Sequence, residues 1–317
     1  MTTIFRVDEP EKFYTPPPET FLLNYRGSVA HNMYVPKNDP KHIDDIDLIG
    51  FCFAPPEHYL GLTDWGSRGT KEIKDDPYDV VLYEIRKAFS LLLQGNPNIM
   101  SVLWTHPAHQ IVKTDFSKRL LENKHLFLGK HVHAAFAGYA HSQLTRMESR
   151  EPAEIREYLG VTAELKRRGK HPNHRGEMIE APADHPAHFA EWGDDKLFAR
   201  LVSFQKKGEN LGYLGDKRKQ LVLEHGYDSK NAAHLIRLLR MCIEFMETGE
   251  MIVYRVSDRE ELLAIKRGDW KLEDIKSLAV DLFEKARVAR DKSSLPVGPA
   301  RKEVEKLLVE ILRENLK

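Results

Sequence analysis

Short apolar runs in the first third of the chain predict buried strands. These runs lie at residues 21–28, 46–55 and 78–85. Continuous apolar runs of this length, bounded by Gly, Pro and Asp residues, are typical of strands in the interior of a sheet. Directly after the third run, apolar residues recur every three or four positions up to Leu93, which predicts a helix that ends at Gly95. We therefore expect an α/β (α+β) front third.

Helical periodicity dominates the chain after about residue 101. The predicted helices lie at residues 130–149, 152–168, 230–246, from 257 onwards, 271–290 and 299–316. Before the first strand, a run of three prolines at 16–18 predicts an extended arm over residues 1–20. The expected organisation is a core with a small mixed sheet at 21–110 and a large helical domain at 111–317 that closes over its cleft.

Charge and composition narrow the class of protein. The 317 residues carry 48 Lys and Arg against 48 Asp and Glu, so the formal net charge is zero. A balanced charge argues against a protein that simply coats nucleic acid, although a local basic face can still steer a polyanion. The chain has only two cysteines, no apolar run of membrane-spanning length and no signal-peptide pattern at its start. We expect a cytoplasmic protein without membrane contact.

Three acidic residues carry the most informative pattern. Asp45 and Asp47 are separated by one residue at the start of the second strand, and Asp79 lies at the start of the third. Alternate residues of a strand point to the same face, so Asp45 and Asp47 are predicted to project together. Carboxylates placed so close repel each other unless a divalent cation lies between them, and such hard oxygen ligands suit Mg²⁺ or Mn²⁺. Asp79 would complete a two-metal site.

Gly27 and Ser28 supply the second half of such a site. Glycine lets the backbone approach a phosphate closely, and the next N–H and hydroxyl can donate to its oxygens. Metal ions and phosphate donors in one cleft favour in-line attack on the α-phosphate of a nucleoside triphosphate, with pyrophosphate leaving.

The order of these motifs resembles the DNA polymerase beta superfamily of nucleotidyltransferases. Gly-Ser, a loop, the run DIDLIG and an acid on the strand YDVVLY follow one another as in that superfamily. Further segments resemble a branch found beside RNA ligases in RNA-repair gene clusters. They are YEIRKAFSLLLQGNPNIMSVLW (83–104), FAGYAHSQL (136–144), GYDSKNAAHLIRLLR (226–240), ETGEMIV (247–253), AIKRGDW (264–270) and SSLPV (293–297). The likeness spans roughly residues 22–308.

The resemblance implies a role for each matching residue. Asp45 and Asp47 match the paired metal-binding carboxylates. Asp79 matches the third acid, which helps to bind the catalytic metal and accepts the proton of the attacking hydroxyl. Gly27 and Ser28 match the triphosphate grip. The implied reaction transfers a nucleoside monophosphate from a nucleoside triphosphate, such as ATP, to a hydroxyl acceptor, and the family context favours an RNA end.

A second set of residues matches the Lys, His and Arg of the same family. They are Lys230, His234 and Arg237, which lie at positions i, i+4 and i+7 of a predicted helix and so share one face. The resemblance implies that they line the nucleotide cleft opposite the acids. A polar helix face turned to solvent would produce the same spacing.

Two alternative functions fit the same residue pattern. The cleft could bind a nucleotide or an RNA end without chemistry, or the acids could serve a transferase that modifies a protein. Basic stretches at 166–171 and 217–219 suit either RNA contact or a solvated surface.

Overall fold

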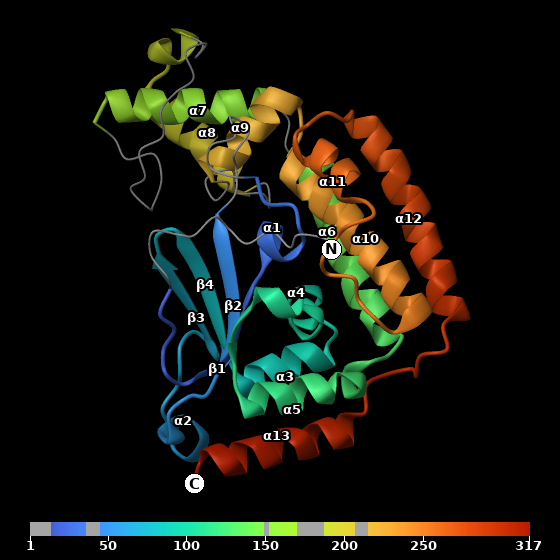
Figure 1. Ribbon diagram of the computed structural model, residues 1–317. Helices are drawn as coiled ribbons and strands as arrows, with labels where there is room; N and C mark the ends of the chain where they lie inside the picture. The colour runs from blue at the N-terminus through green and yellow to red at the C-terminus, as the bar shows by residue number, and fades with distance from the viewer. Residues whose placement is uncertain (1–13, 36–44, 149–151, 170–186, 207–214) are drawn as a thin grey trace. The chain divides into compact units, whose positions relative to one another are not determined.

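The computed structural model describes residues 14–35, 45–148, 152–169, 187–206 and 215–317 (Figure 1). The chain forms two compact units. We call the first the sheet unit, which takes residues up to 140, 237–262 and 279–317, and the second the helical unit, which takes 141–236 and 263–278. The sequence pattern predicts a single boundary at residue 110, whereas each of these units combines separate stretches. Of the expected N-terminal arm, residues 1–13 lie outside the described residues.

The sheet unit contains a five-stranded mixed sheet in the order β3-β4-β2-β1-β5. The strands are β1 (Thr20–Tyr25), β2 (Ile46–Cys52), β3 (Thr70–Asp75), β4 (Tyr78–Glu84) and β5 (Gln110–Lys113). Strands β2 and β4 run parallel, and the other neighbouring pairs run antiparallel. The predicted small mixed sheet is confirmed. The sequence pattern did not reveal the two edge strands, because β3 is mostly polar and β5 has only four residues, two of them polar.

One predicted strand ends earlier than expected. The run at 21–28 was expected to be strand throughout, but β1 ends at Tyr25 and a short helix, α1 (Gly27–Ala30), follows. The backbone turns at Gly27, whose φ of +59° lies in the left-handed region that glycine adopts most readily. Gly27 and Ser28 therefore belong to a turn and helix beyond the strand.

Several short helices surround the sheet. They are α2 (Pro56–Leu60), α3 (Ile85–Leu93), α4 (Pro97–Met100), α5 (Asp115–Glu122) and the 3₁₀ turns η1 (Ser101–Trp104), η2 (Pro107–His109) and η3 (Lys124–Phe127). The predicted helix up to Leu93 is confirmed, and the Glu84 carboxylate caps it by accepting from two backbone N–H groups of its first turn. The C-terminal helix α13 (Arg301–Asn315) packs on α3 and η3.

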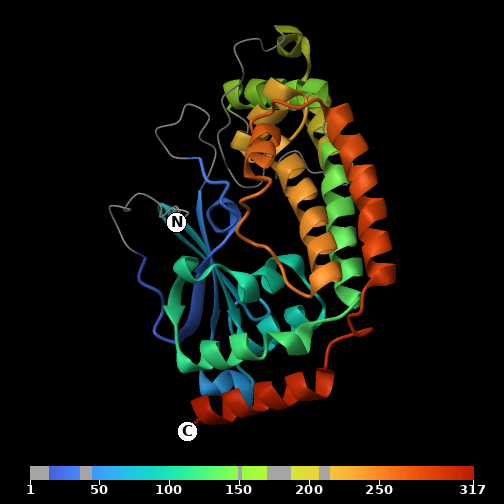
Figure 2. The ribbon, with the colours of Figure 1, turned by 45° about the vertical axis from the view of Figure 1, so that its right-hand side comes forward.

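Long helices from the rear of the chain complete the core. They are α6 (His131–Glu148), α10 (Ser229–Thr248), α11 (Arg259–Lys266) and α12 (Leu272–Lys292). All four were predicted, with ends shifted by one or two residues. Figures 1 and 2 show the parts of α6, α10 and α12 that belong to the sheet unit lying side by side. None of the helices in the described part of the chain is long and apolar enough to cross a membrane.

The helical unit has a core of its own. Its further helices are α7 (Pro152–Arg167), α8 (Asp194–Lys206), α9 (Asp216–His225) and the 3₁₀ turn η4 (Ala187–Glu191). Tyr158, Phe189 and Phe204 are among the largest buried side chains of this core. The predicted helix at 152–168 is confirmed as α7.

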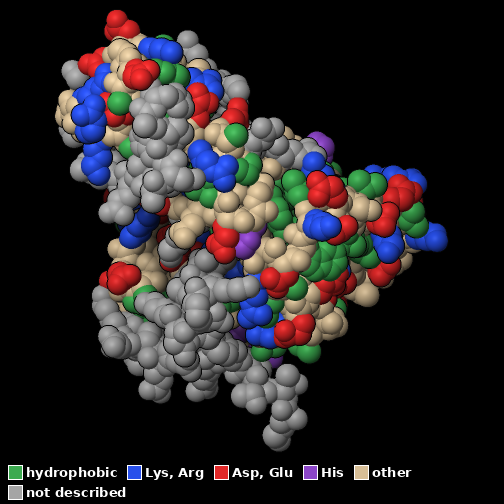
Figure 3. All heavy atoms as spheres, turned by 90° about the horizontal axis from the view of Figure 1, so that it is seen from above, with side chains coloured by type: hydrophobic (Ala, Val, Ile, Leu, Met, Phe, Trp, Pro, Cys, Tyr) green, Lys and Arg blue, Asp and Glu red, His purple; other side chains and the backbone are tan. Residues whose placement is uncertain are grey.

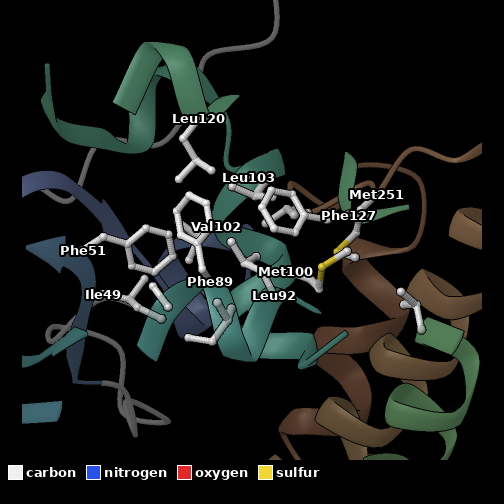
Figure 4. Packing of buried hydrophobic residues seen from close by; sticks show 14 of the residues in the cluster. Ile49, Phe51, Phe89, Leu92, Met100, Val102, Leu103, Leu120, Phe127 and Met251 are labelled. Carbon is white, nitrogen blue, oxygen red and sulfur yellow. The ribbon is translucent and has the colours of Figure 1, made fainter. Parts of the chain in front are cut away.

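The two faces of the sheet bury different residues, and their alternation orients the acids. Ile49 and Phe51 of β2 belong to the large core that α3, η1 and the long helices cover, which Figure 4 shows around Phe89. Leu48 and Cys52 belong to a second core on the opposite face. Because side chains alternate along a strand, Asp47 lies on the same face as Ile49 and Phe51.

Candidate active site

Two of the three predicted acids are neighbours across the sheet. Asp47 on β2 and Asp79 on β4 are direct partners in the parallel register, and each is the second residue of its strand. Both side chains are half-exposed. Paired positions on neighbouring strands place their side chains on the same face, about 5 Å apart. The sheet therefore brings Asp47 and Asp79 together at one end of the helix-covered face.

Two cations flank this pair of acids along the same row of the sheet. On β3, Lys74 is the register partner of Asp79. Beyond β1, the backbone N–H of Arg26 donates to the Asp47 carbonyl oxygen at 2.9 Å, and its guanidinium lies 3.5 Å from Asp47 Oδ1. We call the four side chains Lys74, Asp79, Asp47 and Arg26 the acid row. The outer cations partly offset the repulsion between the two inner carboxylates.

Asp45 lies at the mouth of β2, immediately before its first residue, and is exposed. In the described part of the chain, no group of three or more His, Cys, Asp or Glu side chains lies close enough to hold a metal ion together. The structure thus brings together Asp47 and Asp79, and the participation of Asp45 in a shared metal site stays a prediction.

The turn at Gly27 lies directly against one of these carboxylates. A Cβ atom added to Gly27 would overlap Asp47 Oδ2, so the carboxylate would have to move. Ser28 follows in α1 and is half-buried. The backbone of the predicted phosphate grip and the predicted metal-binding carboxylate therefore occupy one site, as the sequence motifs predict for Gly27, Ser28 and Asp47.

The far end of α1 is held by a segment from the rear of the chain. His31 Nδ1 lies 2.8 Å from the Val253 carbonyl oxygen, which can only accept, so this nitrogen carries the proton. Asn32 Nδ2 donates to the Arg255 carbonyl oxygen at 2.8 Å, and Arg259 Nε donates to the Asn32 carbonyl oxygen at 2.9 Å. The sequence pattern indicates no role for any of these residues, because the partners lie more than 200 positions apart along the chain.

That segment is stabilised by a buried ion network. The Arg255 guanidinium, which is 2% exposed, donates to both carboxylate oxygens of Glu244 and of Asp258 at 2.7–2.9 Å. Arg240 donates to Asp258 at 2.9 Å and to Glu261 at 2.7 Å. Burial alone would raise the pKa of Asp258, but the hydrogen bonds from Arg255 and Arg240 outweigh burial and lower it. We call these five residues the Arg255 network.

The predicted Lys, His and Arg all lie on α10, in two different environments. Arg237 belongs to the sheet unit and is buried, and its Nε has no hydrogen-bond partner among the described residues. Burial, with a further effect from Arg255, lowers the pKa of Arg237 to about 9, so it stays charged at neutral pH. Lys230 and His234 belong to the helical unit. Burial and the nearby charges of Arg218 and Lys230 lower the pKa of His234 to about 4, which keeps it neutral.

The basic stretches are largely neutralised by acids of their own unit. Arg167 and Arg168 both donate to the Glu164 carboxylate, and Arg218 donates to Asp228 at 2.6 Å. Residues 170 and 171 lie outside the described residues. On the face seen in Figure 3, basic and acidic side chains are intermixed. The described arginines of these stretches therefore offer less positive charge to a polyanion than their sequence suggests.

A stretch of the chain that includes the three acids is similar to a known family. Residues 39–162 match the RNA repair pathway DNA polymerase beta family, RlaP. The resemblance to the DNA polymerase beta superfamily, in its RNA-repair branch, is confirmed. The matched stretch includes Asp45, Asp47 and Asp79 and begins after Gly27 and Ser28. No curated protein and no solved structure matches the chain. Over these residues the chain is therefore similar to a DNA polymerase beta-like family of RNA repair.

Proposed function

We propose that the protein transfers a nucleoside monophosphate from a nucleoside triphosphate to a hydroxyl at an RNA end, with release of pyrophosphate. One observation carries this proposal. Asp47 and Asp79 are register partners on parallel strands, and the turn at Gly27 is pressed against the Asp47 carboxylate. Nucleotidyl transfer needs carboxylates to bind metal ions and backbone donors to bind phosphates, and a glycine turn can supply these donors.

The donor set fits a hard divalent cation. Asp47 and Asp79 offer oxygen ligands side by side, and Asp45 at the strand mouth is the further ligand we assign. Mg²⁺ or Mn²⁺ bound there would neutralise the triphosphate and favour ionisation of the attacking hydroxyl. Without the metal, Arg26, at 3.5 Å from Asp47, supplies positive charge on one side of the pair. We propose that Arg26 exchanges this carboxylate for a phosphate oxygen when the substrate binds.

The residues act on the substrate as follows. The backbone at Gly27 and the N–H and hydroxyl of Ser28 hold the β- and γ-phosphates. Asp79 takes the proton of the acceptor hydroxyl as its oxygen attacks the α-phosphorus. The bond between the α-phosphorus and the bridging oxygen breaks, and pyrophosphate leaves with the electron pair. Asp47, together with Asp45, would hold the divalent cation, which would supply the positive charge that orients the α-phosphate for attack in line with the leaving group.

The α10 residues keep their predicted role in this proposal. Arg237 supports it most directly, because it is a buried cation in the sheet unit with one unpartnered donor. Guanidinium groups bind phosphate oxygens in a fixed geometry. Lys230 and His234 lie in the helical unit, and we keep for them the proposed role of nucleotide-binding donors, through the ammonium group and the neutral imidazole.

Labelled triphosphates test this function. Each α-³²P-labelled triphosphate is incubated with Mg²⁺ or Mn²⁺ and with single-stranded RNA, DNA or protein acceptors. We expect label in the RNA and an equal amount of pyrophosphate, both abolished by EDTA. Triphosphate binding without pyrophosphate release would identify a non-catalytic binding module. Label in protein alone would identify a protein-modifying transferase. Either result would overturn the proposed reaction.

A further inference from the structure

A groove in the sheet unit is not used by the steps above. It lies between residues 103–113 and 250–256 and has a volume of about 870 Å³. We call it the Trp104 groove. The side chains that matter to its chemistry are Trp104, His106, Lys113, Lys124, Glu250 and Tyr254.

Trp104 is held in one orientation in this groove. Its indole N–H donates to Glu250 Oε2 at 2.6 Å, and its ring packs edge-on against Phe245 at 5.6 Å between centroids. Lys124 donates to the same Glu250 oxygen at 2.8 Å and places its ammonium group 4.9 Å from the centre of the indole. The groove therefore presents a pre-positioned aromatic ring together with a cation, the combination by which single-stranded nucleic acids are bound.

A second aromatic cluster continues the groove. The rings of His106 and Tyr254 lie 5.5 Å apart, and His109 lies behind them at 6.1 Å and 5.5 Å respectively. The Ala108 backbone N–H donates to His106 Nδ1 at 3.2 Å, which orients the imidazole. Both His106 and Tyr254 are half-exposed, so their rings are available to a ligand.

The open side of the groove is apolar and basic. Ile252 and Val256 are 53% and 59% exposed on the segment that forms one wall. Lys113 is exposed on the opposite wall. The lining contains Lys113 and Lys124 against the single acid Glu250, which leaves it net positive. An extended stretch of seven residues such as 250–256 spans up to about 20 Å, which gives room for more than one base.

Both walls of the groove are bonded to the elements that carry the acid row. Directly before one wall, the Val102 carbonyl oxygen accepts from Asn24 Nδ2 at 3.2 Å. Asn24 lies two residues before Arg26 and so on the same face of the sheet. On the other wall, the carbonyl oxygens of Val253 and Arg255 bind the far end of α1. The groove therefore lies on the same face of the sheet as Asp47 and Asp79.

We propose that the Trp104 groove binds the single-stranded end of a nucleic acid and leads its terminal hydroxyl to the acid row. The role of the hydroxyl rests on the proposed function, but binding of the strand does not. Single strands expose the faces of their bases for stacking, whereas a duplex hides them. The phosphates between the bases would lie near Lys113 and Lys124. Because stacking tolerates any base, binding should depend little on sequence.

Fluorescence anisotropy with a labelled ten-nucleotide RNA, without triphosphate or metal, tests the groove. The full-length protein should bind the single strand at least tenfold more tightly than a blunt duplex of the same sequence. Tyr254→Leu and Trp104→Leu should each weaken binding about tenfold, whereas Tyr254→Phe, which keeps the ring, should not. Trp192→Leu is the matched control, because Trp192 also carries a lysine over its ring, Lys196 at 3.8 Å, but belongs to the helical unit. Unchanged melting temperatures would show that the variants fold.

The outcomes separate this proposal from the proposed function. Strand binding that depends on Tyr254 without any transfer would uphold the groove and overturn the reaction. If the Tyr254→Leu and Trp104→Leu variants transferred nucleotide to RNA with unchanged KM and bound the strand with unchanged affinity, the proposed role of the groove would be wrong. Loss of triphosphate binding in the same variants, with strand binding intact, would also overturn it, since the groove would then hold the base of the donor nucleotide.

Discussion

The sheet unit contains two clusters of carboxylates and guanidinium groups that differ in how deeply they are buried and in how closely their charges approach each other. In the Arg255 network the buried guanidinium makes four hydrogen bonds of 2.7–2.9 Å to two carboxylates. In the acid row, Arg26 approaches Asp47 only to 3.5 Å, and their side chains are 31% and 26% exposed. The first cluster is closed to a ligand, and the second is open to one.

The contrast shows that the same residue types form a buried structural network in one place and stay accessible to a ligand in another. A buried charge must be fully paired, because leaving it unpaired costs several kcal/mol. A carboxylate near the end of a strand stays partly hydrated. It can therefore bind a metal ion or accept a proton without first breaking a buried ion pair. The Arg255 network holds the segment that anchors α1, and α1 begins at the glycine turn of the acid row. Substitutions in the two clusters should therefore affect different quantities.

The largest effect is expected from Asp47→Asn. The amide keeps the shape but cannot bind a divalent cation as a carboxylate does, so transfer should fall by roughly a thousandfold or more. The melting temperature should stay the same or rise, because one of two adjacent carboxylates is removed. Mn²⁺ binding, followed by electron paramagnetic resonance, should be lost together with activity. The exposed Asp64→Asn is the control and should change neither. Full activity in the Asp47 variant would show that the assignment is wrong.

Arg255→Met should mainly lower stability. The substitution leaves the carboxylates of Glu244 and Asp258 without their main partner, which costs about 3–5 kcal/mol in buried networks. Urea denaturation would measure the loss. Arg287→Met removes an arginine with two carboxylate partners on the exposed side of α12 and should leave the urea midpoint almost unchanged, because solvent screens exposed ion pairs. Equal losses for the two variants would contradict the distinction between a closed network and an exposed one.

Gly27→Ala should lower both the transfer activity and the stability by a moderate amount. The left-handed backbone costs an L-residue roughly 1–2 kcal/mol, and the new methyl group displaces the Asp47 carboxylate. We expect transfer to fall about ten- to a hundredfold, with a small loss of melting temperature. Gly138→Ala is the control. It lies within α6 with open space around it, so alanine should stabilise the protein by about 0.5–1 kcal/mol and leave transfer unchanged.

The smallest effect is expected on the melting temperature at low pH. The pKa of Asp258 is lower in the folded protein than in the unfolded chain, so its stabilising contribution is present above the unfolded value of about 3.9 and is lost as the pH falls below it. The difference in melting temperature between the native protein and Arg255→Met should therefore narrow below about pH 4. A difference that stays constant from pH 7 to pH 3 would show that Arg255 acts by packing alone.

Much of the fold could be predicted because its elements are specified locally. The strands at 46–52 and 78–84 are largely apolar runs, and the long helices have unbroken periodicity, so local patterns located their ends within about three residues. Strand β3 was missed because Ile73 is its only large apolar residue. Of the predicted site residues, the structure brings Asp47, Asp79 and Gly27 together. The sequence did not indicate Arg26 or Lys74, since an isolated cation has no sequence signature.

Sequence alone determined which residue types are available: carboxylates that start two apolar strands, a glycine followed by serine, and helices rich in paired charges. These depend on neighbours within a few positions, so a linear pattern records them. Only the tertiary structure decided that Asp47 lies opposite Asp79, that Arg26 and Lys74 close the row, and that a segment beyond residue 250 anchors α1. Strand register and long-range hydrogen bonds depend on how distant segments pack, and packing has no counterpart in the order of residues.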